Sequence, residues 1–229
     1  MELRNHYANL HNSALSIINK EGFSQDADLD NPMDLRRGLT LLLRPNLQVK
    51  EAFETFIHKA QHILPDQYFY QAADLHVTVM PIISCYEGFS LEKLDLDKYE
   101  SLIQKALEGI GKIELNFEGV FTSPSCLIIK GYPLNDALTR FRQNLRNSFA
   151  TSKVEQSLDK RYKLVTAHST VVRFSKPIEE VNAVLALVDA FSNHKFGQQA
   201  FDQVEFVFND WYQRKSIVKT LNTYTLPFR

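Results

Sequence analysis

The chain has 229 residues, 44% of them hydrophobic, and a formal net charge of −1. This length and apolar content are sufficient for one large domain or two small lobes around a real core. The balance of 26 basic and 27 acidic residues lacks the basic excess with which proteins bind long nucleic acids, but it is compatible with a short RNA end or a small phosphate compound. Two cysteines, Cys85 and Cys126, are too few for a disulfide framework or a cysteine-based zinc site.

Residues 1–37 are predicted to form an N-terminal helical extension and a connection. Apolar side chains recur at helical spacing over residues 2–20, and Gly22 offers a C-terminal stop. Polar residues interrupt this pattern, so we expect neither a signal peptide nor a membrane anchor, and a cytoplasmic protein. The acidic stretch 24–37 is typical of a surface connection. It begins like a calcium loop, but Asn31 and Arg37 replace the glycine and the bidentate glutamate that such a loop needs.

Two similar series of elements follow, which predicts an α+β fold of two pseudo-symmetric lobes. The first series consists of a strand at 39–44, a helix at 49–64, a strand at 75–84, a helix at 97–110 and a strand at 112–121. The second consists of a strand at 125–131, a helix at 134–149, a strand at 166–174, a helix from Pro177 to about residue 191 and a strand at 201–208, before a last strand at 216–226. No flexible linker separates the two series, so we expect one domain, 38–229. Its lobes are expected at about 38–122 and 123–229, and the two lobes can exchange strands.

In each series the second strand carries a histidine and, two positions later, a threonine. These pairs are His76 with Thr78 and His168 with Thr170. Side chains at i and i+2 of a strand lie on the same face, so each pair is expected to face a groove while the apolar face packs on helices. If a two-fold axis relates the lobes, both imidazoles meet across that groove. One could then remove a proton from an attacking hydroxyl while the other, protonated, gives one to the departing oxygen, and the threonines could hold the phosphoryl oxygens.

The runs HVTV at 76–79 and HSTV at 168–171 resemble the two H-x-T/S-x motifs of the 2H phosphoesterase superfamily. The longer run HSTVVR is similar to the H-x-T-L-x-R signature of its 2′-5′ RNA ligase-like, or RNA 2′,3′-cyclic phosphodiesterase, branch, with Val171 in place of leucine. The resemblance covers roughly residues 38–225. It implies the bilobal LigT-like fold, in which two antiparallel sheets face a central groove with helices outside.

The resemblance also implies an activity and the residues for it. The expected enzyme acts on 2′,3′-cyclic phosphates or 2′-5′ phosphodiesters, by hydrolysis or by the reverse ligation, and needs no cofactor or metal. His76, Thr78, His168 and Thr170 would be catalytic, and Arg173 would contact the phosphate. Arg173 lies an odd number of positions after His168, so this contact requires the strand to end or bulge near Phe174.

Aromatic residues near predicted strand ends could stack on a base or sugar, and packing is the competing interpretation for each. They are Tyr70, Tyr86, Tyr132 and Trp211, of which we assign Tyr86 and Tyr132 to substrate binding. Two other functions stay open. One is a non-catalytic module that holds a nucleotide or RNA end, and the other is a metal-dependent hydrolase using His58 and His62, for which no third ligand is evident. We expect a monomer whose partner is a nucleotide or short RNA end, with no membrane partner.

Overall fold

The computed structural model describes residues 2–227, so the predicted domain bounds at residues 1 and 229 lie outside the described residues. The helices are α1 (Glu2–Glu21), α2 (Leu47–Ile63), α3 (Leu96–Leu107), α4 (Ala137–Ala150) and α5 (Val181–Ala190), with a 3₁₀ turn at Leu91–Lys93. The strands are β1 (Arg37–Leu43), β2 (Tyr68–Phe69), β3 (Val77–Tyr86), β4 (Ile113–Ser123), β5 (Cys126–Pro133), β6 (Ser169–Arg173), β7 (Lys195–Phe201), β8 (Gln203–Asp210) and β9 (Lys219–Thr225). The predicted α+β class and the two antiparallel sheets are confirmed.

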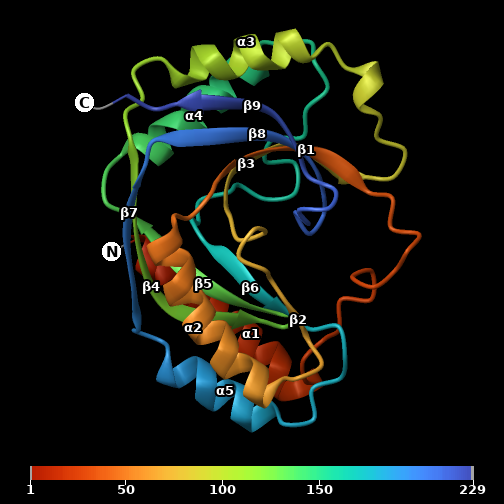
Figure 1. Cartoon of the computed structure of the whole chain (residues 1–229), viewed down its shortest axis with the longest axis vertical. Coiled ribbons are helices and arrows are strands. Elements are labelled where there is room, and N and C mark those ends of the chain that lie inside the picture. Colours follow the sequence, from red (N-terminus) through yellow and green to blue (C-terminus); the bar gives the residue numbers. More distant parts are fainter. Residues whose placement is uncertain (1, 228–229) are drawn as a thin grey trace.

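The strands form a four-stranded sheet of order β3-β1-β8-β9 and a five-stranded sheet of order β2-β6-β5-β4-β7. All pairings are antiparallel. Figure 1 shows the four-stranded sheet with α3 and α4 toward one end of the molecule, and the five-stranded sheet with α1, α2 and α5 toward the other. Neither sheet follows the contiguous division at residue 122, because β4 belongs to the five-stranded sheet while β8 and β9 join β1 and β3. The chain exchanges strands between its halves.

A shared hydrophobic core joins both sheets. It includes Leu41 in β1, Phe53 in α2, Phe117 in β4 and Phe141 in α4, all fully buried. The helices contribute to it through the apolar stripe that their sequences predict. Asn46 starts α2, because its side-chain oxygen accepts a hydrogen bond from the Val49 N–H at 3.0 Å and so satisfies a donor in the first turn.

Several element boundaries differ from the sequence-based expectation. The helix α5 begins at Val181 and not at Pro177, so the proline does not occupy its first turn and that expectation is wrong. The strands β2 and β7 were not predicted, since β2 has only two residues and β7 carries polar residues and Gly197 at a φ of 118°. Pairing with β6 and β4, respectively, makes them strands. Tertiary contacts therefore decide both.

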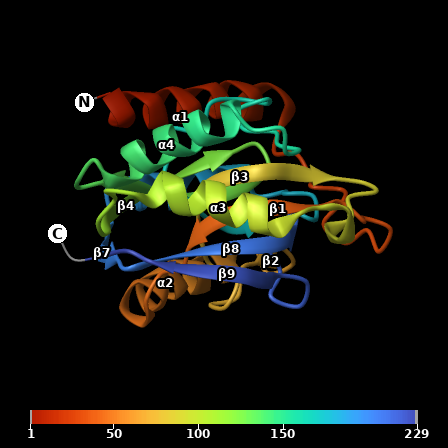
Figure 2. The same ribbon diagram turned by 90° about the horizontal axis from the view of Figure 1, so that it is seen from above.

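The N-terminal extension packs on the five-stranded sheet. Its helix α1 contacts β4, and Figure 2 shows α1 and α2 at opposite margins of the molecule. Tyr7 in α1 is buried in a small cluster with Phe121, Cys126 and Ile128, whose side chains alternate along β4 and β5 with those of the main core. The extension thus covers the second face of this sheet. Within residues 2–227, no helix combines the length and the hydrophobicity that crossing a membrane requires.

Candidate active site

A cavity of about 200 Å³ brings the two predicted histidine pairs together. Thr78 reaches it from β3 in the four-stranded sheet and Thr170 from β6 in the five-stranded sheet. The two histidines line the same cavity from the residues directly before these strands. The sheets therefore meet at this point with a histidine and a threonine on each side, as the repeated pattern predicts.

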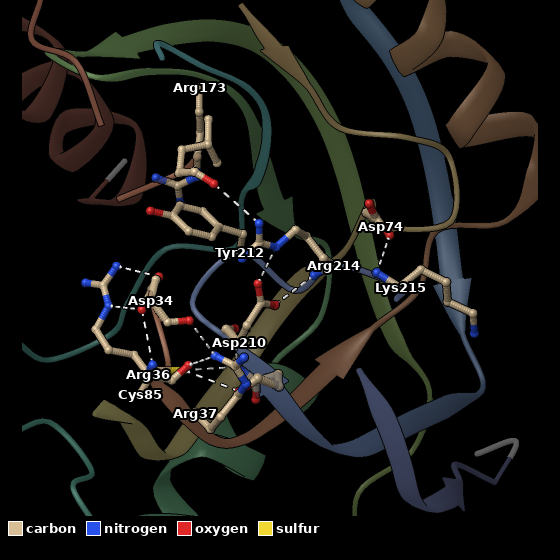
Figure 3. Close-up of polar contacts among 12 residues, drawn as sticks. Asp34, Arg36, Arg37, Asp74, Cys85, Arg173, Asp210, Tyr212, Arg214 and Lys215 are labelled. Carbon is tan, nitrogen blue, oxygen red and sulfur yellow. Dashed lines mark hydrogen bonds and ion pairs between the residues drawn. The ribbon is translucent and has the colours of Figure 1, made fainter. Parts of the chain in front are cut away.

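His76 is held by the backbone of the loop that precedes β3. Its Nδ1 lies 2.7 Å from the carbonyl oxygen of Asp74. A carbonyl can only accept, so Nδ1 carries the hydrogen, and Nε2 of the neutral ring keeps its lone pair. The buried carboxylate of Asp74 in turn accepts a hydrogen bond of 2.7 Å from the Lys215 N–H, an interaction drawn in Figure 3. The loop is thereby anchored to the segment that follows β8.

His168 has a different partner. Its Nδ1 lies 2.9 Å from the hydroxyl oxygen of Thr166, which can either donate or accept. When the hydroxyl donates to Nδ1, the neutral ring carries its hydrogen on Nε2. The two imidazoles can therefore present opposite hydrogen-bonding roles through Nε2, although their sequence motifs are alike.

Both imidazoles are neutral at pH 7 in the free protein. Burial lowers the pKa of His76 to about 3, and the positive charges of Arg44 and Arg173 act in the same direction. Burial also lowers the pKa of His168 to about 4, with further contributions from Arg142 and Arg173. The expected protonated partner is therefore not present before substrate binds. An anionic phosphate would raise both pKa values, because a nearby negative charge favours the imidazolium.

A buried arginine that sequence reasoning missed joins the two motif strands. Arg142 in α4 is 3% exposed and donates hydrogen bonds to the carbonyls of Val79 at 2.8 Å, Thr78 at 2.9 Å and Thr166 at 2.7 Å. Burial lowers the pKa of Arg142 to about 10, so the guanidinium stays charged at neutral pH. It fixes both histidine–threonine runs and places a positive charge beside them. The sequence offered one indication of this role: Arg142 lies four positions after Leu138, so it is a basic residue on the apolar stripe of the helix.

Matching β-bulges shape the two motif strands. In β6, Ile128 of β5 pairs with Thr170 and Leu127 with Val172, which leaves Val171 as an extra residue. In β3, Leu42 of β1 pairs with Thr78 and Leu41 with Met80, which leaves Val79 as an extra residue. A bulge shifts the alternation by one position, so Arg173 lies on the same side as Thr170 and lines the cavity. The bulge at Val171 lies two residues before β6 ends at Arg173. In β3, the residue that occupies the position equivalent to Arg173 is Pro81.

Arg173 is held in place by residues from distant parts of the chain. Its Nε donates to the Tyr70 hydroxyl at 2.9 Å, and its Nη1 donates to Oδ2 of Asp26 at 3.2 Å. The Tyr212 hydroxyl donates to Oδ1 of the same carboxylate at 2.8 Å, and the guanidinium lies 5.2 Å from the Tyr212 ring centre. Figure 3 shows Arg173 beside Tyr212. The predicted surface connection thus contributes Asp26, which orients the arginine expected to contact phosphate.

Solved structures share this arrangement of sheets and helices, whereas no family model and no curated protein matches the sequence. Escherichia coli LigT in complex with 3′-AMP superimposes with a TM-score of 0.54 at 13% identity, over 84% of this chain and 99% of LigT. A phosphoesterase gives a TM-score of 0.55 at 14% identity, over 84% of this chain and 99% of its own. A conserved protein of unknown function from Agrobacterium tumefaciens gives 0.59 at 13% identity, over 93% and 97%. The chain has the LigT-like fold. The fold implied by the two H-x-T motifs is therefore confirmed.

Within the LigT-like fold, the structure does not bring Tyr132 or Tyr86 to the cavity. Tyr132 lies beneath α1, 5.4 Å from the Tyr7 ring and with the Arg4 guanidinium 4.4 Å above it. Tyr86 is 40% exposed at the end of β3 and packs against Phe89. Neither is among the described residues that line the cavity. Their place near a strand end could not reveal which side of the sheet, or which end of the cavity, each would face.

Other aromatic residues take that position in the LigT-like fold. Tyr70 and Trp211, both noted in the sequence, line the cavity, as does Tyr162 from the loop after α4. The Trp211 ring lies 5.1 Å from the Arg36 guanidinium and 4.7 Å from that of Arg161. Aromatic and positively charged groups are thus combined at this part of the site.

The helical histidine pair is not among the described residues that line the cavity. His58 and His62 lie on an exposed part of α2. Among residues 2–227, no three His, Cys, Asp or Glu side chains gather in a way that could hold a metal ion. The histidine–threonine cavity is therefore the candidate active site.

Proposed function

We propose that this protein is a two-histidine phosphoesterase that acts on ribose 2′,3′-cyclic phosphates or 2′-5′ phosphodiesters without a bound metal. The observation that carries the proposal is the meeting of His76–Thr78 and His168–Thr170 in one cavity, with Arg173 beside them. The LigT-like fold supports it, since LigT itself has been solved with 3′-AMP, ATP and NADP⁺. The small cavity and the near-neutral charge of the chain favour a nucleotide or a short RNA end as the substrate.

In this proposal His76 acts as the general base for hydrolysis. Its Nδ1 donates to a carbonyl, so Nε2 is available to remove a proton from an attacking water molecule. The water oxygen bonds to phosphorus and one ribose oxygen departs, which opens the ring of a 2′,3′-cyclic phosphate and yields a monoester. His168 delivers a proton to the departing oxygen. It acquires that proton when the bound phosphate raises its pKa from about 4.

The remaining residues stabilise the charge that develops on phosphorus. The hydroxyls of Thr78 and Thr170 donate to non-bridging oxygens, and Arg173 adds a cation held by Asp26. The charged Arg142 lies behind the motif strands and contributes positive potential without touching the substrate. Run in reverse, the same groups would form a phosphodiester from a cyclic phosphate and a hydroxyl.

The test is to incubate the purified protein with the four nucleoside 2′,3′-cyclic phosphates and a 2′-5′ dinucleotide in excess EDTA. Hydrolysis should persist in the chelator. Replacing either histidine, as His76→Gln or His168→Gln, should lower kcat/KM by a factor on the order of 10² to 10⁴. A matched control is the double variant His58→Gln/His62→Gln, whose exposed rings lie on α2 and should leave the rate unchanged.

Two results would overturn the proposal: activity that disappears with EDTA, or activity that survives in both histidine variants. Tight nucleotide binding without turnover would instead support the non-catalytic binding module. The expected monomeric state and cytoplasmic location stay predictions.

A further inference from the structure

Two residues at one end of the cavity have buried amide oxygens that the proposed chemistry does not use. Asn209 is the second-to-last residue of β8 and is 2% exposed. Gln213 lies in the turn that follows β8 and is 5% exposed. Both residues line the cavity. Within the part of the chain that the structure describes, neither Asn209 Oδ1 nor Gln213 Oε1 has a hydrogen-bond partner. A buried acceptor without a partner is costly, so each such group calls for an explanation.

The local structure fixes how these amides are presented. The Nδ2 group of Asn209 donates to the Asp210 carbonyl at 2.8 Å and contacts the Cys85 sulfur at 3.4 Å, which leaves Oδ1 as the atom to be satisfied. Gln213 has a φ of 60°, a left-handed conformation that residues other than glycine, asparagine and aspartate rarely adopt. Strained residues of this kind concentrate at binding and catalytic sites. The Asn209 amide is thus held by two side-chain contacts, while Gln213 is fixed through its backbone, whose N–H donates to the Asp210 carbonyl at 3.3 Å.

The sheet register places this end at a distance from the phosphate-binding end. Asn209 pairs with Gly38 and Thr78 pairs with Leu42, and residues opposite each other in antiparallel strands project to the same side. Asn209 and Thr78 thus share one face of the four-stranded sheet, separated by four positions of β1, or about 13 Å at ~3.3 Å per residue. A ligand that spans this distance extends beyond a phosphate group to its base.

Resting on the proposed nucleotide substrate, we propose that Asn209 and Gln213 bind the edge of a guanine base. Two acceptors require two donors, and guanine is the RNA base whose Watson–Crick edge presents a ring N–H and an exocyclic amino group side by side. Adenine and cytosine present one amino group beside a ring acceptor, and uracil presents one N–H between two carbonyls. The aromatic ring of Tyr162, which lines the same cavity, supplies flat surface for the base.

The test compares guanosine with inosine 2′,3′-cyclic phosphate, which differ only by the amino group. The wild-type protein should hydrolyse the guanosine compound with a kcat/KM about tenfold or more above that of inosine, because inosine leaves one buried acceptor unpaired. Gln213→Met keeps the length of the side chain but removes its acceptor, and should reduce this preference to about twofold or less. Methyl riboside 2′,3′-cyclic phosphate, which has no base, reports on folding and chemistry in each protein, so the guanosine and inosine rates of each protein are expressed relative to it.

The outcomes separate this inference from the proposed function. Equal rates for guanosine and inosine, with all compounds hydrolysed, would mean that only water satisfies the two amides, and would overturn the guanine site alone. A preference for adenosine or uridine would overturn it as well. If no compound is hydrolysed, the proposed function fails, and calorimetric titration with guanosine and inosine 3′-monophosphates then decides: tighter binding of the guanosine compound supports the site, and equal affinity overturns it.

Discussion

The two half-buried imidazoles of the cavity should make this protein lose stability in mild acid, and replacing them with glutamine should remove much of that loss. Burial lowers the pKa of His76 to about 3 and of His168 to about 4, whereas the unfolded chain titrates its histidines near 6.5. Below pH 6.5 the unfolded state therefore binds more protons than the folded state. The free energy of unfolding must then fall as the pH falls toward the folded pKa values.

The magnitude follows from these pKa values. Between pH 7.5 and pH 4.5, each ring should lower the free energy of unfolding by roughly 2–3 kcal/mol, and the pair by about 5 kcal/mol. This is a large part of the ~5–15 kcal/mol by which a typical domain is stable. The assay is urea unfolding at both pH values, followed by the fluorescence of the single tryptophan, Trp211. In the double variant His76→Gln/His168→Gln, the difference between the two pH values should be smaller by about that amount.

Matched variants make the result specific. His58→Gln/His62→Gln removes two exposed histidines from α2 and should leave the wild-type difference unchanged. Each single replacement in the cavity should recover about half of the effect of the double variant. The reasoning would be refuted if the double variant lost as much stability between pH 7.5 and pH 4.5 as the wild type, because the imidazoles would then titrate as they do in water.

Three further variants test the surroundings of the site. Arg142→Met leaves the carbonyls of Thr78, Val79 and Thr166 without this donor and should lower the free energy of unfolding, measured in urea, by about 3–5 kcal/mol. A loss under about 1 kcal/mol would contradict the role of Arg142 in joining the two motif strands. Asp26→Asn removes the charge that orients Arg173 and should lower kcat/KM about tenfold, mainly through KM, with little change in melting temperature, whereas an unchanged KM would assign Asp26 no part in positioning. Gly131→Ala would drive a methyl group onto the backbone carbonyl of Ala167 and should destabilise the protein by more than about 2 kcal/mol in thermal unfolding; a wild-type melting temperature would show that this contact can relax.

Features with a local physical cause were predictable from the sequence. The apolar stripes of α1, α2 and α3 depend on a spacing of three and four residues, and that spacing is visible within a single window. Likewise, the pairing of His76 with Thr78 and of His168 with Thr170 depends only on strand alternation. The position of Arg173 was a conditional prediction, since it required a bulge, and the register of β5 with β6 provides one at Val171.

Features that depend on contacts between distant segments were decided by the tertiary structure. Sheet membership of β4 follows from backbone pairing with β5 and β7, which no local pattern encodes. The roles of Arg142 and Asp26 arise because α4 and the N-terminal connection pass close to the motif strands. Tyr132 shows the converse, since α1 covers the place where a base was expected to stack. The amino-acid sequence by itself determined which groups can do the chemistry, through periodicity and spacing, whereas long-range packing decided which of them meet, how they are oriented, and that both histidines are kept neutral by burial.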